Sequence, residues 1–241
     1  VANGQVLGGA TVPIASSPQF ENGASVGLRE ADPGVSSRFL SLVRAAPLRK
    51  LALLDVGCGW GRVTLLLAPE AHRAVGLDND RAAIRNARRV ARERSLGKVK
   101  FVVADAERVE YGEWRPGMVI AHLCMSDAII ERATRALAPG CCLAFVCFHT
   151  DQWKETGKVS RFAYGEERMR SVLQANGFAT EHLEVEREVV EFPGVAEGLR
   201  LVEEIRPNWE ADGRWANFVA FVEAGGRTLT RSHLIGKARK K

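Results

Sequence analysis

Residues 53–62 decide the fold, and they read Leu53-Leu54-Asp55-Val56-Gly57-Cys58-Gly59-Trp60-Gly61-Arg62. An apolar run of strand length leads into three glycines at alternate positions, and a helix-length segment follows. Glycine is needed where the backbone turns tightly and approaches a ligand with no Cβ in the way. In an open α/β sheet, ligands bind beyond the carboxyl ends of the strands, which is where such a loop lies. The stretch therefore predicts a strand–loop–helix unit with a binding site at the loop.

Between residues 51 and 148, apolar runs of strand length alternate with helix-length segments. The expected strands are 51–56, 74–77, 99–103, 117–121 and 142–148, and the expected helices are 62–68, 80–94 and 127–137. The apolar character of these strands is nearly continuous, as is typical of strands covered on both faces. Alternating strands and helices predict an α/β fold with a parallel, doubly wound sheet.

The segments on either side of this region complete the expected organisation. Residues 1–35 are rich in Gly, Pro and Ser without periodicity and predict a mobile N-terminal arm or partial lid before a domain that spans 36–241. Helices are expected at 36–46 and 165–176, a loop at 149–164, and strands at 184–192 and 228–238. Residues 193–226 hold two helix-like stretches, so we expect a helical insertion before the last strand, placed to cap a pocket.

Composition sets outer limits on the function. The 241 residues, 46% apolar and 26% charged, suffice for one large globular domain. The formal charge of 34 − 29 = +5 permits an acidic partner without requiring one. No apolar run approaches the ~18 residues of a membrane span, so no membrane partner is expected. Five cysteines without C-x-x-C spacing favour free thiols over disulfides or a metal site, and hence a cytoplasmic protein.

The chemistry around the loop indicates which ligand it takes. Arg62 stands where a dinucleotide-binding turn needs a small residue for close helix–strand packing. Asp55 would repel a pyrophosphate, by about 1 kcal/mol at 4 Å even in water, but suits a ligand that carries a positive charge and no phosphate. Asp78 ends the second strand, where a carboxylate accepts hydrogen bonds from ribose hydroxyls. A glycine loop, a cationic centre and a ribose together describe S-adenosylmethionine better than NAD.

At this point the sequence resembles the class I S-adenosylmethionine-dependent methyltransferases. The matching segments are Asp55–Gly61, Gly76-Leu77-Asp78, Val103-Ala104-Asp105-Ala106 and Leu137-Ala138-Pro139-Gly140. The likeness covers residues 36–192 together with the final strand. It implies a three-layer α/β/α sandwich around a Rossmann-like, mostly parallel sheet of seven strands, the last of them antiparallel.

The resemblance also implies which residues contact the cofactor. These are Asp55 at its amino-acid end, Gly57, Cys58, Gly59 and Gly61 along the loop, Asp78 at the ribose, Asn79 near the adenine, Asp105 and Ala106 at the adenine edge, and His122 beside the methionine moiety. S-adenosylhomocysteine would be the product. A purely structural alternative exists for two of them, because Asn79 can cap the following helix and Asp105 can cap a turn.

No catalytic residue emerges from the sequence. Methyl transfer from a sulfonium is a direct in-line displacement, so the protein chiefly aligns the reactants and excludes water. A base is required only if the nucleophile carries a proton. His122 and His149 are candidates at strand ends, with Asp151 as a partner for His149, and simple packing is the alternative for each. His233, inside the last expected strand, is interpreted as structural.

The residues after the fourth strand narrow the range of acceptors. Residues Ala121-His122-Leu123-Cys124 lack the Asn/Asp-Pro-Pro-aromatic element that, in this family, marks methylation of nucleic-acid bases at an amino nitrogen. The insertion carries Phe192, Trp209, Trp215, Phe218 and Phe221, and small-molecule pockets are lined by aromatic side chains. We therefore interpret the chain as a methyltransferase acting on a small-molecule or carrier-bound metabolite.

Three alternatives remain open at the level of sequence. An RNA methyltransferase could use the arginine-rich segment 81–94 and the basic end 237–241 to follow phosphates. Both are instead expected to be solvated, the first as the outer face of a helix and the second as a frayed terminus, so nucleic acid is not the favoured partner. The others are an NAD-dependent oxidoreductase and a cofactor-binding regulatory module. The methylated atom and the oligomeric state stay undetermined.

Overall fold

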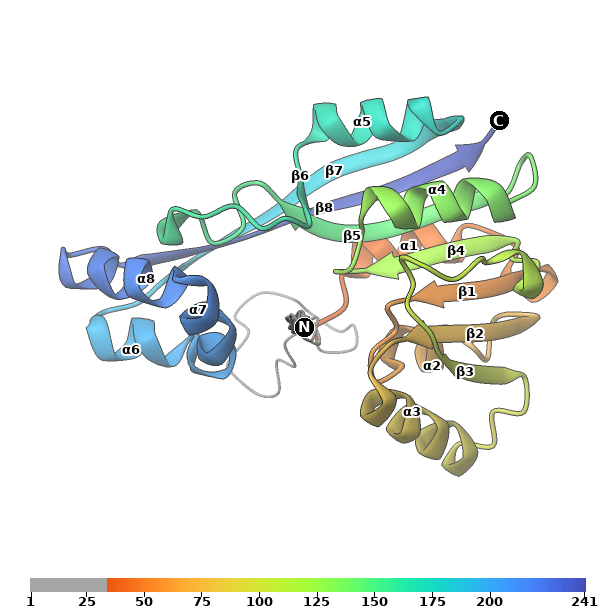
Figure 1. Cartoon of the computed structure of the whole chain (residues 1–241), viewed down its shortest axis with the longest axis horizontal. Helices are drawn as coiled ribbons and strands as arrows, with labels where there is room; N and C mark the ends of the chain where they lie inside the picture. The colour runs from red at the N-terminus through yellow and green to blue at the C-terminus, as the bar shows by residue number, and fades with distance from the viewer. Residues whose placement is uncertain (1–33) are drawn as a thin grey trace, which may run out of the picture.

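The computed structural model describes residues 34–241, and it shows one mixed sheet between two layers of helices (Figure 1). The strands are β1 Ala52–Val56, β2 Arg73–Asp78, β3 Val99–Val103, β4 Met118–His122, β5 Cys142–His149, β6 Ala163–Tyr164, β7 Phe178–Glu191 and β8 Thr228–Lys240. The helices are α1 Ser37–Arg44, α2 Arg62–Leu67, α3 Arg81–Glu93, α4 Asp127–Ala136, α5 Glu166–Ala175, α6 Val195–Arg200, α7 Arg206–Asp212 and α8 Arg214–Glu223. The predicted arm, apart from its last two residues, lies outside the described residues.

The sheet has the order β3-β2-β1-β4-β5-β8-β7. Strands β1 to β5 run parallel, and β8 is antiparallel to both β5 and β7. The predicted α/β fold with an antiparallel last strand is therefore confirmed. An eighth strand was not expected. It is the two-residue β6, which pairs with β5 inside the segment predicted as a loop.

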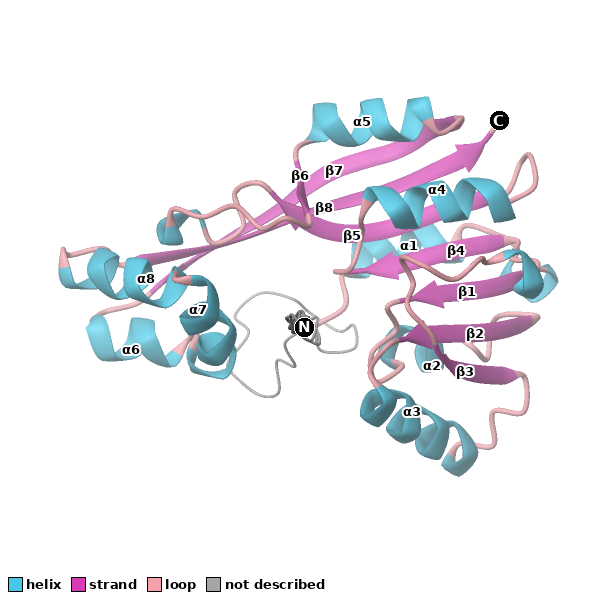
Figure 2. Cartoon of the chain, in the orientation of Figure 1, coloured by secondary structure: helices cyan, strands magenta, loops and turns pink. Residues whose placement is uncertain are grey.

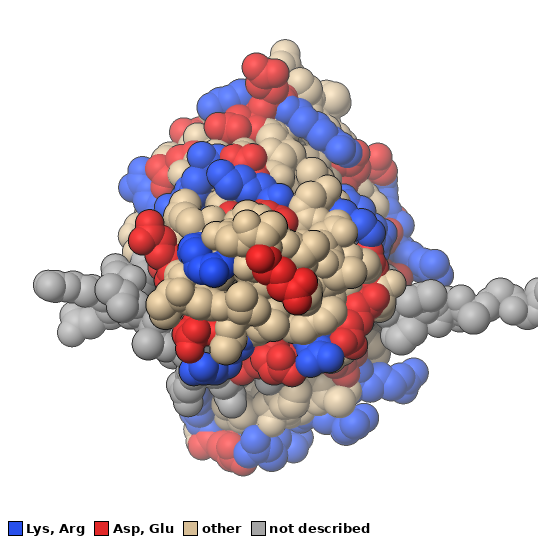
Figure 3. Space-filling view, turned by 90° about the vertical axis from the view of Figure 1, so that its left-hand side faces the viewer, with Lys and Arg blue, Asp and Glu red and all other residues tan. Residues whose placement is uncertain are grey.

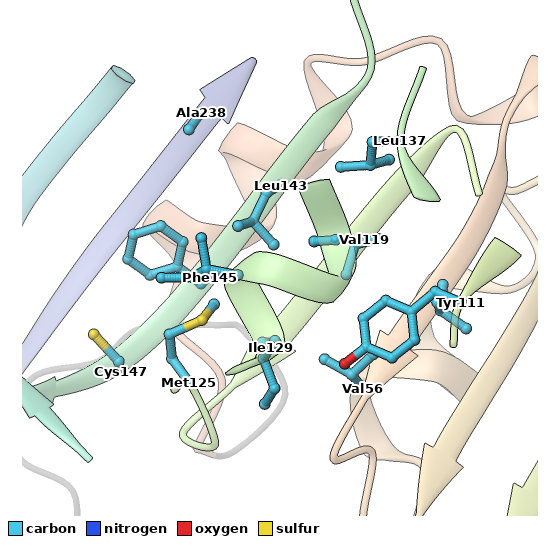
Figure 4. Packing of buried hydrophobic residues seen from close by; sticks show 14 of the residues in the cluster. Val56, Tyr111, Val119, Met125, Ile129, Leu137, Leu143, Phe145, Cys147 and Ala238 are labelled. Atoms are coloured by element: carbon cyan, nitrogen blue, oxygen red, sulfur yellow. The ribbon is translucent and has the colours of Figure 1, made fainter. Parts of the chain in front are cut away.

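Helices cover both faces of this sheet (Figure 2). Phe39 and Val43 of α1 and Val63 and Leu67 of α2 are buried against one face. On the other face, α4 and α5 cover a larger apolar core, in which Ile129 packs with Val119 of β4 and Phe145 of β5 (Figure 4). Helices lie on both sides of β1 to β5, so both faces of these strands are covered. This explains their nearly continuous apolar character.

The strands β7 and β8 form a long antiparallel hairpin, in which Phe178 of β7 is paired with Lys240 of β8. β7 begins earlier than the expected 184–192. The hairpin extends past the parallel strands and carries α6, α7 and α8 at its tip, on the side toward which the carboxyl ends of β1 and β4 point (Figure 1). Residues 193–226 are thus helical, as predicted, with α7 as an additional helix. Pro207 lies in the first turn of α7, where its missing N–H is tolerated.

The insertion is built around an aromatic core of its own. Trp209 is fully buried, with its ring 5.3 Å from that of Trp153 and 5.5 Å from that of Phe218. Phe192 is also buried and packs edge-on against Phe218. Three of the five aromatic residues expected to line a cap, Phe192, Trp209 and Phe218, therefore stabilise the insertion instead. The other two, Trp215 and Phe221, are partly exposed.

The basic end of the chain is an ordered part of β8, so the expectation of a frayed terminus was wrong. Lys237 is buried, and its Nζ donates to the carbonyl of Leu42 (3.1 Å). Lys240 Nζ donates to the carbonyl of Asn176 (3.3 Å), and Arg239 pairs with Glu181. These contacts follow from the pairing of β8 with β5 and β7, which holds both sides of the strand.

All five cysteines lie in the described part of the chain, and all are free thiols. Cys142 and Cys147 are buried, and the other three are partly buried. Among residues 34–241, none of the helices combines the length and the apolar character needed to cross a lipid bilayer.

Candidate functional site

The glycine loop between β1 and α2 lies at the point where the strand order reverses, between β1 and β4. Gly57, Gly59 and Gly61 all have left-handed backbone, with φ of +65°, +53° and +80°. A Cβ on Gly57 would lie 2.5 Å from Cys124 Sγ, and one on Gly61 would lie 2.7 Å from the ring of Phe101. Around Gly59 nothing lies within 4 Å of such a Cβ. Packing therefore requires the outer two glycines, whereas the middle one presents bare backbone to open space.

Asp78, at the end of β2, holds this loop in place. Its Oδ2 accepts a hydrogen bond from the N–H of Gly59 (2.7 Å), and its Oδ1 accepts one from the N–H of Asp80 (2.8 Å). Each carboxylate oxygen has two lone pairs, so both retain capacity for a further donor. The side chain is only partly buried. It is thus placed to accept hydrogen bonds from vicinal hydroxyls of a ligand that lies on the loop.

Asp55 lies beneath the loop rather than at its surface. It is 1% exposed, and its Oδ2 accepts a hydrogen bond of 2.6 Å from Thr64 Oγ1 of α2. Its Oδ1 is buried without a hydrogen-bond partner among the described residues. Burial raises the pKa of Asp55 to about 7; the hydrogen bonds from Thr64 oppose this rise, and the charge of Asp78 adds to it. A nearby cation would favour the ionised form.

The surroundings of Asp55, Asp78 and Gly59 show whether S-adenosylmethionine fits this site. The orphaned Oδ1 of Asp55 and its proximity to Asp78 make the region beneath the loop deficient in positive charge, which a cationic ligand would supply. The open space at Gly59 allows close approach to the backbone. The residues therefore fit a cationic nucleoside. The side chain of Asp55 points to α2, so its influence on such a ligand would be electrostatic.

The expected adenine residues lie at the same carboxyl edge. Asn79 is exposed beside Asp78, and Asp80 caps α3 by accepting from the N–H groups of Ala82 (2.7 Å) and Ala83 (3.1 Å). The alternative that Asn79 is the cap is therefore wrong, and its side chain is available to a ligand.

Asp105 follows β3, and its Oδ1 accepts from the N–H of Glu107 (2.9 Å). It does cap a turn, and it pairs with Arg108 as well. The carbonyl of Ala106 accepts from the hydroxyl of Tyr111 (2.6 Å), which holds the chain beyond β3 in place.

His122 ends β4, next to β1. The ring is partly buried and lies 5.8 Å from the ring of Phe39. Burial, and then the charges of Arg62 and His233, lower the pKa of His122 to about 3. The imidazole is therefore neutral at neutral pH and is a weak proton acceptor.

His149 has a different environment. It is 6% exposed, and its Nδ1 contacts Ser232 Oγ (3.1 Å) and accepts from the N–H of Asp151 (3.2 Å). Its Nε2 lies 3.4 Å from a carboxylate oxygen of Glu166. The carboxylate of Asp151 is 3.8 Å from Nδ1 and pairs with Arg187. The expected pairing of His149 with Asp151 is thus a side-chain contact of 3.8 Å that Asp151 shares with Arg187, and both ring nitrogens of His149 have contacts within the fold.

Sequence reasoning missed two residues that support the site. Thr64 supplies the hydrogen bond to Asp55, and the only signal was a hydroxyl in an otherwise apolar helix stretch. Cys124 Sγ donates to the carbonyl of Val56 (2.9 Å) and packs against Gly57. Cys58, expected at the cofactor, has its Sγ directed at Gly76, and burial raises the pKa of this thiol.

Comparison with known proteins shows which proteins this chain resembles. A family model described as a methyltransferase domain matches residues 53–140, the segment from β1 to the turn after α4. A 2-heptyl-1-hydroxyquinolin-4(1H)-one methyltransferase of Mycobacteroides abscessus is 37% identical over 95 residues, which are 36% of this chain and 42% of that protein. The match thus spans less than half the length of this relative.

Two solved structures share the fold over most of the chain. The [4+2]-cyclase SpnF is 25% identical with a TM-score of 0.58, and the alignment covers 88% of this chain and 85% of the cyclase. A phosphoethanolamine N-methyltransferase 2 of Haemonchus contortus, in complex with phosphomonomethylethanolamine and S-adenosylhomocysteine, is 20% identical with a TM-score of 0.57 over 86% of this chain and 54% of that one.

The domain match, the sheet order and the glycine loop agree. Residues 53–140 are therefore similar to a methyltransferase domain, and the described residues share their fold with the two solved structures above. This similarity favours a methyltransferase over the alternative of an NAD-dependent oxidoreductase, which Arg62 also disfavours.

Proposed function

We propose that the protein binds S-adenosylmethionine at the glycine loop and transfers its methyl group to a small-molecule acceptor by direct in-line displacement. The observation that carries this proposal is the contact between Asp78 and the N–H of Gly59. It brings a carboxylate with spare acceptor capacity to the open backbone of the loop, beside a buried acidic group that favours a cation.

The cofactor would supply a sulfonium-bound methyl carbon that is already activated for displacement. We assign the ribose hydroxyls to Asp78, the adenine to Asn79 and the chain at Asp105 and Ala106, and the charge complement to Asp55. Gly57, Gly59, Gly61 and the main chain at Cys58 would form the surface on which the cofactor lies, with His122 at its reactive end.

The residues near the reactive end of the cofactor would position the reactants rather than transfer a proton. The neutral imidazole of His122 holds one N–H and one acceptor nitrogen, and its pKa of about 3 makes it a weak base. Aligning the two reactants and excluding water accounts for most of what an in-line displacement requires. We place the helical insertion 193–226 as a cap on this side of the sheet, where it would exclude water from the acceptor.

The relative from Mycobacteroides abscessus supports a small-molecule acceptor, because its name describes a hydroxylated heteroaromatic ring with an alkyl tail. The likeness to a cyclase shows that the fold by itself does not define the reaction, so methyl transfer must be measured directly. With five free thiols, a reducing compartment such as the cytoplasm is the location that we propose.

The RNA alternative has less support. On α3, Arg88 donates to the carbonyl of Phe101 (2.8 Å), and Arg89 pairs with Glu93 and contacts Asn86. The face seen in Figure 3 mixes acidic and basic side chains among neutral ones rather than forming a field of one sign. A phosphate-tracking protein would lose affinity steeply as salt rises. A steep loss of RNA binding between low and physiological salt would favour this alternative.

The decisive experiment has two measurements. Calorimetric titration with S-adenosylmethionine and S-adenosylhomocysteine tests the site, and transfer of a labelled methyl group to 1-hydroxyquinolin-4(1H)-ones and to fractionated metabolites tests the reaction. We expect binding of both cofactor forms and labelled product from a small molecule. Absence of cofactor binding would refute the proposed function, whereas tight binding without any labelled product would favour a regulatory module.

The cap has its own test. Residues 193–226 are replaced by a short turn that joins β7 to β8, whose pairing continues below the insertion. We expect cofactor affinity to persist and acceptor methylation to be lost. Undiminished turnover in the shortened protein would contradict the proposed cap.

A further inference from the structure

Two histidines lie on one face of the sheet at its carboxyl edge, on either side of β5. His122 of β4 is in register with Val146 of β5, which is in register with Ile235 of β8. His233 of β8 is in register with Phe148. Because side chains alternate along a strand, His122, Val146, Phe148 and His233 project to the same face. At about 4.8 Å between strands, β4 and β8 are about 10 Å apart, and the buried Val146 of β5 lies between them on this face.

Aromatic and polar groups lie beside these two rings. Phe39, from the first turn of α1, lies 5.8 Å from the ring of His122. Phe148 lies 6.0 Å from the ring of His233. Ser36, the N-cap of α1, donates to Glu186 of β7 (3.2 Å), and Glu186 is in register with His233. The first turn of α1 and residues of β4, β5, β7 and β8 therefore come together around the two histidines.

The hydrogen-bonding capacity of the two imidazoles is not used by the described part of the chain. His149 has contacts to both ring nitrogens, whereas no hydrogen bond to a described residue forms at His122 or His233. Both rings are partly buried. A ligand that accepts from or donates to these nitrogens would use this hydrogen-bonding capacity.

The electrostatics of the region favour an oxygen ligand over a cation. Burial and the charge of Arg231 lower the pKa of His233 to about 4, and that of His122 is about 3, so both rings are neutral N–H donors at neutral pH. The charged groups that face them are Arg62 of α2, Arg231 of β8 and Glu186 of β7. Glu186 is hydrogen-bonded by Ser36, and burial raises its pKa.

We propose that His122 and His233 form the acceptor subsite, and that it takes an acidic hydroxyl group carried on a flat apolar ring, such as a phenol or an N-hydroxy heteroaromatic compound. This inference rests on the proposed function and names its substrate class. The partly exposed Phe148 contacts the substrate ring, and the imidazole N–H groups hydrogen-bond to the oxygen. It also changes the assignment of His233, which sequence analysis interpreted as structural.

The group-transfer step balances without a protein base. The hydroxyl proton leaves to water, which is feasible for a phenol with a pKa of about 10 and not for an aliphatic alcohol. The oxyanion is held by the neutral imidazole N–H groups, with Arg62 nearby. The O–C bond then forms as the C–S bond of the sulfonium methyl donor breaks, which leaves a neutral ether and a neutral thioether.

The test compares His233→Gln with His72→Gln, an exposed histidine at the opposite end of the strands. The acceptors are 1-hydroxyquinolin-4(1H)-one, 4-nitrophenol, benzyl alcohol and benzylamine. We expect methylation of the first two only. For them His233→Gln lowers kcat/KM about 10–100-fold, as for loss of a hydrogen bond to a charged group, and leaves the affinity for S-adenosylhomocysteine within about twofold. His72→Gln changes neither quantity.

Two further readouts keep the result unambiguous if a variant folds poorly. In the folded wild-type protein, ¹⁵N shifts of the His122 and His233 rings are expected to move when 4-nitrophenol is added with S-adenosylhomocysteine. The pH at which the rate rises is expected to follow the acidity of the acceptor across a series of phenols. Preference for benzylamine or benzyl alcohol, unmoved ring shifts, or an unchanged kcat/KM in His233→Gln would overturn the subsite. Failure to bind S-adenosylhomocysteine would instead overturn the proposed function itself.

Discussion

The two ends of the molecule are stabilised in different ways. At β1 and β2 the site is made by short-range contacts to the backbone and by one buried acid: Asp78 holds the N–H of Gly59, and Asp55 is held by Thr64. At the far end of β7 and β8, aromatic packing around Trp209 holds the insertion together. The first arrangement depends on particular residues at particular spacings and can be recognised in a sequence. The second depends on packing between residues that are distant in sequence, which many sequences satisfy, so a local sequence pattern does not reveal it.

Trp209→Ala gives the largest expected effect, because it removes the centre of the insertion's core. Replacement of a fully buried Trp costs about 3–5 kcal/mol. We expect the loss to be confined to 193–226 and the packed segment at Trp153, with amide hydrogen exchange accelerated there and unchanged in β1 and β2. Trp215→Ala, at a partly exposed position, serves as the control. Equal acceleration in β1 and β2 would show that the two ends unfold as one unit.

Asp55→Asn tests the buried acid at the other end. The pKa of Asp55 is about 7 in the folded protein against an ordinary value of 3.8, so between these pH values the folded state keeps a proton that the unfolded state has lost. The free energy of unfolding therefore falls as pH rises from about 4 to about 7, by up to about 4 kcal/mol, and this contribution is constant above 7.

Denaturant unfolding across this pH range checks the sign. The free energy of unfolding of Asp55→Asn minus that of wild type should increase from pH 4 to pH 7. Glu110→Gln is the control of opposite direction, since Arg135 lowers the pKa of Glu110 and its stabilising contribution is lost on acidification. Parallel profiles for Asp55→Asn and wild type would show that Asp55 is ionised throughout.

Asp78→Asn comes next in size and addresses the loop directly. The amide keeps one acceptor oxygen but loses the charge and one backbone contact. Losing a charge-assisted hydrogen bond costs about 1.5–3 kcal/mol, which corresponds to about 10–150-fold in affinity for S-adenosylmethionine. Calorimetry measures it, with Asp105→Asn as a smaller comparison. Equal affinity in Asp78→Asn and wild type would remove the ribose assignment.

The contrast between the glycine-loop end and the insertion also explains which features could be predicted from the sequence. The alternation of strands and helices and the position of Asp78 follow from local pattern, and they were predicted. The contact of Thr64 with Asp55 depends on how α2 packs against β1, which periodicity does not give. The choice of Asp80 over Asn79 as the cap of α3 depends on which of two neighbouring polar residues points toward the helix, and periodicity does not decide that either. The ordered end of β8 was mispredicted because basic residues resemble a solvated tail, although Lys237 is buried by strands distant in sequence. Likewise, His149 and His233 differ in their contacts with residues distant in sequence, and the sequence pattern does not show this difference.

Gly59→Ala gives the smallest expected change in stability, and it separates folding from binding. Gly59 has φ of +53° with open space around it, and Gly140, in the turn after α4, has φ of +84° with equally open space. An alanine in left-handed backbone costs roughly 1–2 kcal/mol at either position, so Gly59→Ala and Gly140→Ala should lower the free energy of unfolding alike. Only Gly59→Ala places a methyl group where the cofactor would approach the backbone, so only this variant should lose affinity for S-adenosylhomocysteine. If both variants bind it as well as wild type, the open backbone at Gly59 is a turn and not a binding surface, and the contrast between the two ends of the molecule would lose its chemical basis.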